Sequence, residues 1–312
     1  MFKKLVLGLL VFGLLFSGIS YFNYADFRDK RLAELESASQ LVETSVGQIE
    51  YVVLGDSGPY MLFLHGTPGG YDQSTAVPGY RVIAPSRPGY LRTPLSVGKS
   101  PVAQAQAYAA LLDALAVDRV VVMGASGGGP SALSFAAIYP DRTNALIAIE
   151  AVSQVLAGED EAQMPPFMSS DYMIWLVLSS MSNFMGSEGL VKMLIPSPDN
   201  QQLILADPKN TAIIESLVWS LWPVSLRGAG TDNDTWQFAN LSLSNETIIV
   251  PTLIIHGDED LNVPFAQSEM LAAQIPGSVL HVIKGGDHMM PFTHEREMGE
   301  AVDQFISRLE FD

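Results

Sequence analysis

A serine stands in a setting that favours nucleophilic attack. Ser126 lies in the segment Gly124-Ala125-Ser126-Gly127-Gly128, after the apolar run Val120–Met123 and before a segment of helical character. On a sharp turn from strand to helix, a serine hydroxyl is raised above the edge of the sheet. The backbone N–H of Gly127, at the start of the helix, could bind an oxyanion. We therefore predict Ser126 as a nucleophile for acyl transfer, against the alternative of a glycine-rich turn with an incidental serine.

A nucleophilic serine needs a base and an acid that orients the base. His288 follows the last predicted strand, and Asp260 precedes it by 28 residues. An aspartate held against a histidine fixes its tautomer and stabilises the imidazolium. We predict His288 as the base and Asp260 as the orienting acid. Asp258, Glu259 and Glu150 are the competing carboxylates.

A second glycine-rich segment, His65–Gly70, follows the apolar run Tyr60–Leu64. Its glycines allow the backbone to approach a substrate closely, and we predict that the N–H of Thr67 is the second oxyanion donor. A phosphate-binding loop is the alternative, but this loop contains neither Gly-x-Gly-x-x-Gly nor Gly-Lys-Ser/Thr. His65 itself is predicted to be structural. Histidines and carboxylates do not cluster at metal-ligand spacing, so we predict no metal and no cofactor.

The elements around these residues alternate between strand and helix from about residue 41. Buried apolar strands that alternate with helices indicate the α/β class, a mostly parallel sheet with helices on both faces. Ligands bind such sheets at the carboxyl ends of the strands, where the candidate residues fall. The predicted strands are 48–54, 60–64, 81–84, 120–123, 145–149, 252–256 and 279–283, and the predicted helices are 103–115, 128–139, 268–275 and 295–309.

Residues 153–245 interrupt this alternation. They contain all four tryptophans and six of the 13 methionines of the chain. We predict a mainly helical lid here, inserted in a core formed by residues 41–152 and 246–312. The aromatic and methionine side chains either line an apolar pocket or form the lid's own core.

The N-terminus is apolar. Lys3 and Lys4 precede 18 residues, 5–22, without a charge. Such a run favours membrane insertion, so residues 1–22 are predicted to be an uncleaved signal-anchor, or else a cleaved signal peptide. The charged residues 23–40 are predicted to be a helical linker. Membrane association through residues 5–22 would place the catalytic domain outside the cytoplasm, or free in the periplasm or medium after cleavage.

The overall composition excludes several classes of protein. The net charge is −17, and basic residues do not gather beyond the N-terminal region, so nucleic acid is not predicted as a partner. The chain has no cysteine, which excludes a cysteine nucleophile, a disulfide framework and a Cys-based zinc site. The predicted partner is a small-molecule substrate, and no protein partner is indicated.

Four segments of the chain together resemble the α/β-hydrolase superfamily: the His65–Gly70 loop, the Ser126 turn, the Asp260 turn and the His288 loop. The resemblance covers about residues 45–152 and 247–310, and it is closest to lidded serine esterases and peroxidase-like hydrolases. The order serine, aspartate, histidine is the order of that fold. One departure is that only about 15 residues separate the His-Gly loop from Arg81, so the first covering helix must be short.

The resemblance implies a serine hydrolase that acts through Ser126, His288 and Asp260, with Thr67 and Gly127 as oxyanion donors. A small apolar carboxylic ester is the predicted substrate. An amidase, a C–C bond hydrolase, and a small-molecule receptor of the same fold with little turnover are the alternatives.

Overall fold

A single eight-stranded sheet organises the protein. The computed structural model describes residues 2–156 and 169–309. The strands lie in the order β1-β2-β4-β3-β5-β6-β7-β8. Strands β3 to β8 run parallel, and β2 pairs antiparallel with both β1 and β4. The strands are β1 (Gln40–Thr44), β2 (Gly47–Leu54), β3 (Tyr60–Leu64), β4 (Arg81–Pro85), β5 (Val120–Ala125), β6 (Thr143–Ile149), β7 (Thr252–Gly257) and β8 (Val279–Ile283).

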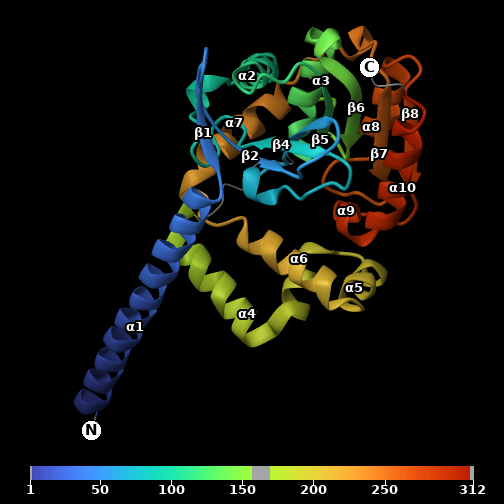
Figure 1. The fold of residues 1–312 in the computed structure, drawn as a ribbon. Helices are drawn as coiled ribbons and strands as arrows, with labels where there is room; N and C mark the ends of the chain where they lie inside the picture. The colour runs from blue at the N-terminus through green and yellow to red at the C-terminus, as the bar shows by residue number, and fades with distance from the viewer. Residues whose placement is uncertain (1, 157–168, 310–312) are drawn as a thin grey trace.

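Apolar layers cover both faces of the sheet, because successive side chains of a strand point to opposite faces. Val120 and Val122 of β5 face one layer, and Val121 faces the other. The first layer is completed by α2 (Pro101–Ala114), α3 (Gly129–Ile138) and α8 (Ala266–Gln274), and the second by α10 (Glu295–Ile306). Figure 1 shows these helices around the twisted sheet. The predicted α/β class is confirmed.

The predicted strands are all present, with ends shifted by at most two residues. Strand β1 was not predicted, because its polar, partly exposed residues lack an apolar pattern. Between β3 and β4 the chain forms only the short 3-10 helix η1 (Tyr71–Gln73), in accord with the short covering helix expected there.

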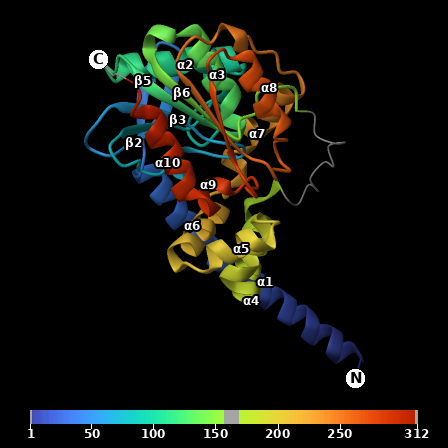
Figure 2. The same ribbon diagram turned by 90° about the vertical axis from the view of Figure 1, so that its right-hand side faces the viewer.

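The described part of the insertion between β6 and β7 contains the α-helices α4 (Asp171–Leu194), α5 (Pro198–Leu205), α6 (Pro208–Trp219) and α7 (Gly228–Ala239). Figures 1 and 2 show α4, α5 and α6 together beneath the sheet, beside α9 (Met290–Thr293). Asn200 of α5 donates hydrogen bonds to the carbonyl of Gly285 and the carboxylate of Asp287, each at 3.0 Å. This insertion therefore contacts the loop that carries His288.

The N-terminal segment forms one helix, α1 (Phe2–Ser37). Its first half extends away from the rest of the protein (Figure 1). Its second half packs against the insertion: Tyr24 is 7% exposed, and its ring lies 5.6 Å from that of Trp175 and 6.5 Å from that of Trp222. The same half carries charged residues from Asp26 onward.

The predicted membrane anchor at residues 5–22 is wrong. Among the helices of residues 2–156 and 169–309, none is both long enough and apolar enough to cross a membrane. The membrane location that rested on this anchor, with the catalytic domain outside the cytoplasm, is wrong with it. The residues of α1 that pack on Trp175 and Trp222 are Tyr24 and Phe27, which follow the apolar run, and these tryptophans lie some 150 to 200 residues further along the chain.

Candidate active site

Ser126 lies at the turn between β5 and α3, at the first residue of the 3-10 helix η3 (Ser126–Gly128). Its φ is 50°, a left-handed conformation that is uncommon for a residue with a side chain. The turn forms because the neighbouring residues are small. A Cβ at Gly124 would lie 2.5 Å from that of Ala132, and one at Gly128 would collide with the carbonyl oxygens of β3 and the loop after it. The sequence therefore raises Ser126 at the carboxyl end of the sheet.

His288 lies between Ser126 and Asp260. Its Nε2 is 3.0 Å from Oγ of Ser126, and its Nδ1 is 2.7 Å from Oδ2 of Asp260. The histidine side chain is 15% exposed, while that of Asp260 is fully buried. The structure thus brings together the three residues that the sequence singled out, in the geometry of a nucleophile, a base and an orienting acid.

Asp260 is held as a carboxylate. Its Oδ1 accepts hydrogen bonds from the backbone N–H groups of Asn262 and Val263. Burial alone would raise the pKa of Asp260, but hydrogen bonds from His256 and His288 outweigh burial and hold this pKa well below its usual range. The ionised form is the one that can orient an imidazole and stabilise its cation.

The competing acids of the same turn face elsewhere. Asp258 binds the ammonium of Lys284 and the N–H of Gly285, and Glu259 is exposed. Neither contacts His288.

Glu150 is a second buried carboxyl group beside the histidine. Its Oε2 lies 3.7 Å from Nδ1 of His288, a full ångström farther than Asp260. Its Oε1 has no hydrogen-bond partner among residues 2–156 and 169–309. Burial, together with the charges of Asp260 and Asp287, raises the pKa of Glu150 well above its usual value. The pKa values of the two carboxyl groups are therefore shifted in opposite directions, down for Asp260 and up for Glu150.

Glu150, Asp260 and His288 also form a group of possible metal ligands, with ligand atoms all within 4.8 Å of one another. In this arrangement Nδ1 of His288 is already bonded to Asp260. A cation there would replace the hydrogen bond that orients the histidine, so the geometry fits a proton relay better than a metal site. The absence of a metal from the mechanism stays a prediction.

The two predicted oxyanion donors are neighbours. A Cβ at Gly66 would lie 3.2 Å from the Cβ of Ser126, so the loop after β3 passes directly beside the nucleophile. A Cβ at Gly127 would collide with the hydroxyl of Thr67 and would lie 3.0 Å from the ring of Phe238. The structure thus places Thr67 and Gly127 together beside Ser126. It also adds Phe238 of α7, which the sequence did not indicate because it lies within the insertion.

His65 has a structural role, as predicted from the sequence. It is buried, its Nε2 accepts the backbone N–H of Arg87 at 2.9 Å, and its Nδ1 lies 2.8 Å from the carbonyl of Gly66. Burial and the nearby Arg87 charge lower the pKa of His65 well below its usual value, so the ring is neutral.

Comparison with known proteins agrees with this fold. The chain belongs to the alpha/beta hydrolase family, whose model matches residues 61–302. An alpha/beta hydrolase fold protein from Nakamurella multipartita is 34% identical, with a TM-score of 0.76 over 86% of this chain and 98% of that one.

Among curated relatives, the uncharacterized hydrolase YcgS of Bacillus subtilis (strain 168) is 29% identical over 78% of this chain and 89% of its own length. A 2-hydroxy-6-oxononadienedioate/2-hydroxy-6-oxononatrienedioate hydrolase of Pseudomonas putida is 26% identical over 83% of this chain and 91% of its own. The protein is therefore an enzyme of the hydrolase class.

Proposed function

We propose that the protein hydrolyses a small apolar carboxylic ester by acyl transfer through Ser126. The observation that carries this proposal is the continuous chain of contacts from Oγ of Ser126 through His288 to the buried Asp260, at 3.0 and 2.7 Å. Both distances lie within the range that proton transfer and orientation require.

The reaction has two halves. In the first, Oγ of Ser126 attacks the ester carbonyl and gives its proton to Nε2 of His288, while the N–H groups of Thr67 and Gly127 bind the oxyanion. The intermediate collapses, and the leaving alcohol takes the proton from His288. In the second, water attacks the acyl-serine and gives a proton to His288. The carboxylic acid then leaves, and the proton returns to Ser126.

An uncharged substrate suits the charges around the site. Two arginines lie beside the loop that bears Thr67, and each is paired with an aspartate. Arg87 pairs with Asp234, and Arg227 pairs with Asp72. Neither offers a free positive charge to a substrate carboxylate, and the ring of Phe238 lies next to Gly127. Trp175 and Trp222, by contrast, are buried against α1. The apolar character of the site therefore rests on Phe238 rather than on these tryptophans.

A second candidate is hydrolysis of a C–C bond in a 2-hydroxy-6-oxo-dienoate. The name of the Pseudomonas putida relative favours it. The same serine, histidine and aspartate would serve both reactions, so only turnover distinguishes them.

The test is labelling followed by substrate profiling. The wild-type protein should react covalently with a fluorophosphonate probe, and Ser126→Ala should abolish the labelling while the circular dichroism spectrum stays unchanged. Labelling that persists in Ser126→Ala would overturn the assignment of the nucleophile. Steady turnover of p-nitrophenyl acetate or butyrate supports an esterase. Turnover of a 2-hydroxy-6-oxo-dienoate alone would support the second candidate.

A further inference from the structure

We propose that α7 of the insertion is part of the catalytic apparatus: Asp234 and Arg227 are positioning residues that hold the oxyanion loop, residues 66–72, against the nucleophile. The inference rests on the proposed function and extends it, because it makes the insertion a determinant of the chemical step as well as a cover over the site.

Asp234 is the centre of the first contact. Its side chain is 3% exposed and forms a bidentate ion pair with the side chain of Arg87, which is 1% exposed. The same carboxylate accepts hydrogen bonds from the hydroxyl of Thr67 at 2.5 Å and of Tyr90 at 2.6 Å. Burial alone would lower the pKa of Arg87, but the adjacent Asp234 outweighs burial and raises it.

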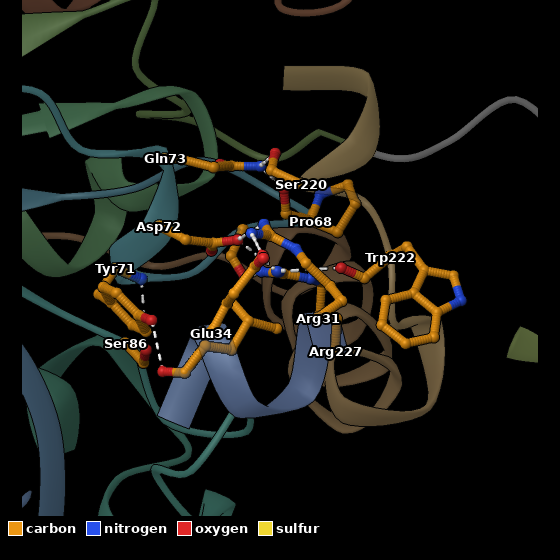
Figure 3. A network of polar contacts seen from close by, with 12 residues as sticks. Arg31, Glu34, Pro68, Tyr71, Asp72, Gln73, Ser86, Ser220, Trp222 and Arg227 are labelled. Atoms are coloured by element: carbon orange, nitrogen blue, oxygen red, sulfur yellow. Dashed lines mark hydrogen bonds and ion pairs between the residues drawn. The ribbon is translucent and has the colours of Figure 1, made fainter. Parts of the chain in front are cut away.

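Arg227, the residue that precedes α7, makes the second contact. Its side chain is 1% exposed, and it donates to the carbonyl of Gly69 at 2.5 Å and to Asp72 at 2.9 Å. Figure 3 shows Arg227 and Arg31 of α1 converging on Asp72, with Tyr71 and Gln73 on either side. Charge-assisted hydrogen bonds of this kind are short and directional, so they fix the backbone that bears them.

The two contacts act on both ends of one loop, from α7 and from the residue that caps its N-terminus. Arg227 is that capping residue, and Asp234 lies seven residues further on, about two helical turns. One holds Thr67, whose N–H is the proposed oxyanion donor, and the other holds Gly69 and Asp72. A substitution in α7 that releases the loop should therefore reduce the stabilisation of the transition state. Binding of the substrate in the ground state should stay nearly unchanged.

The experiment compares Asp234→Asn with Asp232→Asn, the same chemical change at an exposed position of the same helix. Active sites are first counted with the fluorophosphonate, so that misfolded protein does not enter kcat. Loss of a whole oxyanion donor costs about 10²–10³ in kcat, and a displaced donor should cost about tenfold. We expect that loss in Asp234→Asn with KM nearly unchanged, and wild-type kinetics in Asp232→Asn.

A second measurement reports on the oxyanion hole itself. An aryl trifluoromethyl ketone forms a hemiketal with the serine, and its oxyanion occupies the same donors as the transition state. Its affinity should fall in Asp234→Asn by the same factor as kcat. Thr67→Val removes the hydroxyl that donates to Asp234 and accepts from Arg87, and it keeps the ion pair between these two residues. It therefore carries the test if Asp234→Asn does not fold.

The outcomes separate the two proposals. Wild-type protein that neither reacts with the fluorophosphonate nor turns over an ester would overturn the proposed function, and the inference with it. A reactive wild type whose Asp234→Asn and Thr67→Val variants keep wild-type kcat and inhibitor affinity would overturn the inference alone. A rise in KM at constant kcat would also overturn it, because that result assigns α7 to substrate binding.

Discussion

At the scale of single residues, the site contains two buried carboxyl groups whose pKa values are shifted in opposite directions. Asp260 receives hydrogen bonds from two histidines and two backbone N–H groups, while one oxygen of Glu150 receives none. The charge of Asp260 raises the pKa of Glu150 further, because two adjacent carboxylates resist being ionised together.

Asp260→Asn should remove most of the activity, and Asp258→Asn should not. The amide presents the wrong hydrogen-bonding partner to Nδ1 of His288, and the same change in the triad of a serine protease costs about 10⁴ in kcat. Asp258 instead binds Lys284 and the N–H of Gly285. The measurement is kcat for an ester substrate per labelled active site. Equal losses in the two variants would show that the acid is misassigned.

Glu150→Gln should stabilise the protein increasingly as the pH rises. Because the pKa of Glu150 is raised on folding, the native state binds more protons than the unfolded state, and Glu150 lowers the free energy of unfolding as pH rises above about 4.5. Each unit of pKa difference corresponds to about 1.4 kcal/mol. Glutamine does not ionise, so the variant lacks this loss.

Urea unfolding of both proteins between pH 5 and 8 measures this effect. The difference in free energy of unfolding, variant minus wild type, should grow with pH for Glu150→Gln. A difference for Glu150→Gln that does not change with pH would contradict the raised pKa of Glu150.

At the scale of elements, the turn from β5 to α3 tolerates no added volume. A Cβ at Gly128 would lie 2.7 Å from the carbonyl oxygen of His65 and still closer to that of Leu64. Gly128→Ala should therefore destabilise the protein by about 1–3 kcal/mol and reduce activity, because backbone must move to accommodate the methyl group.

Gly299→Ala is the matched substitution, with the opposite expected sign. Gly299 lies within α10, and a Cβ there meets no atom within 4 Å. Alanine is favoured over glycine inside a helix, so a gain of about 0.5–1 kcal/mol is expected. The free energies of unfolding of both variants, from urea titration, test the pair. Similar changes in the two would show that the turn is less crowded than the structure indicates.

The core elements could be predicted from sequence because their signals are local. A strand such as Val120–Ala125 is buried on both faces and reads as a continuous apolar run, and Ser126 follows it directly. Strand β1 lies at the sheet edge, where burial imposes no such pattern. The contacts of α7 could not be predicted, because Asp234 lies 147 residues from Arg87 and no periodicity connects them.

At the scale of the whole molecule, α1 joins the insertion to the core. Tyr24 and Phe27 pack among the aromatic residues of α4 and the segment around Trp222, and Arg31 pairs with Asp72 of the oxyanion loop. The ring of Phe27 lies 5.0 Å from that of Trp222 in an edge-to-face arrangement, which is a favourable geometry for aromatic pairs. One helix therefore contacts both parts of the protein that surround the site.

Tyr24→Ala should lower the free energy of unfolding by about 3 kcal/mol, since truncation of large buried aromatic residues costs about 3–5 kcal/mol and a phenol at a boundary somewhat less. Tyr21→Ala is the control, because Tyr21 is 56% exposed. Urea unfolding monitored by tryptophan fluorescence measures both. A Tyr24→Ala variant as stable as Tyr21→Ala would show that α1 contributes little to the folded protein.

The packing of α1 also orders events during synthesis. Tyr24 leaves the ribosome first, but Trp175 is 151 residues further along the chain and Trp222 further still. At about 5–20 residues per second, the nascent helix waits roughly 8–30 s before the first of these partners is made. Its aromatic face has no native surface to cover it during that interval, while strands β2 to β6 are already available to one another. The aromatic face of α1 is thus synthesised well before the tryptophans that cover it in the folded protein.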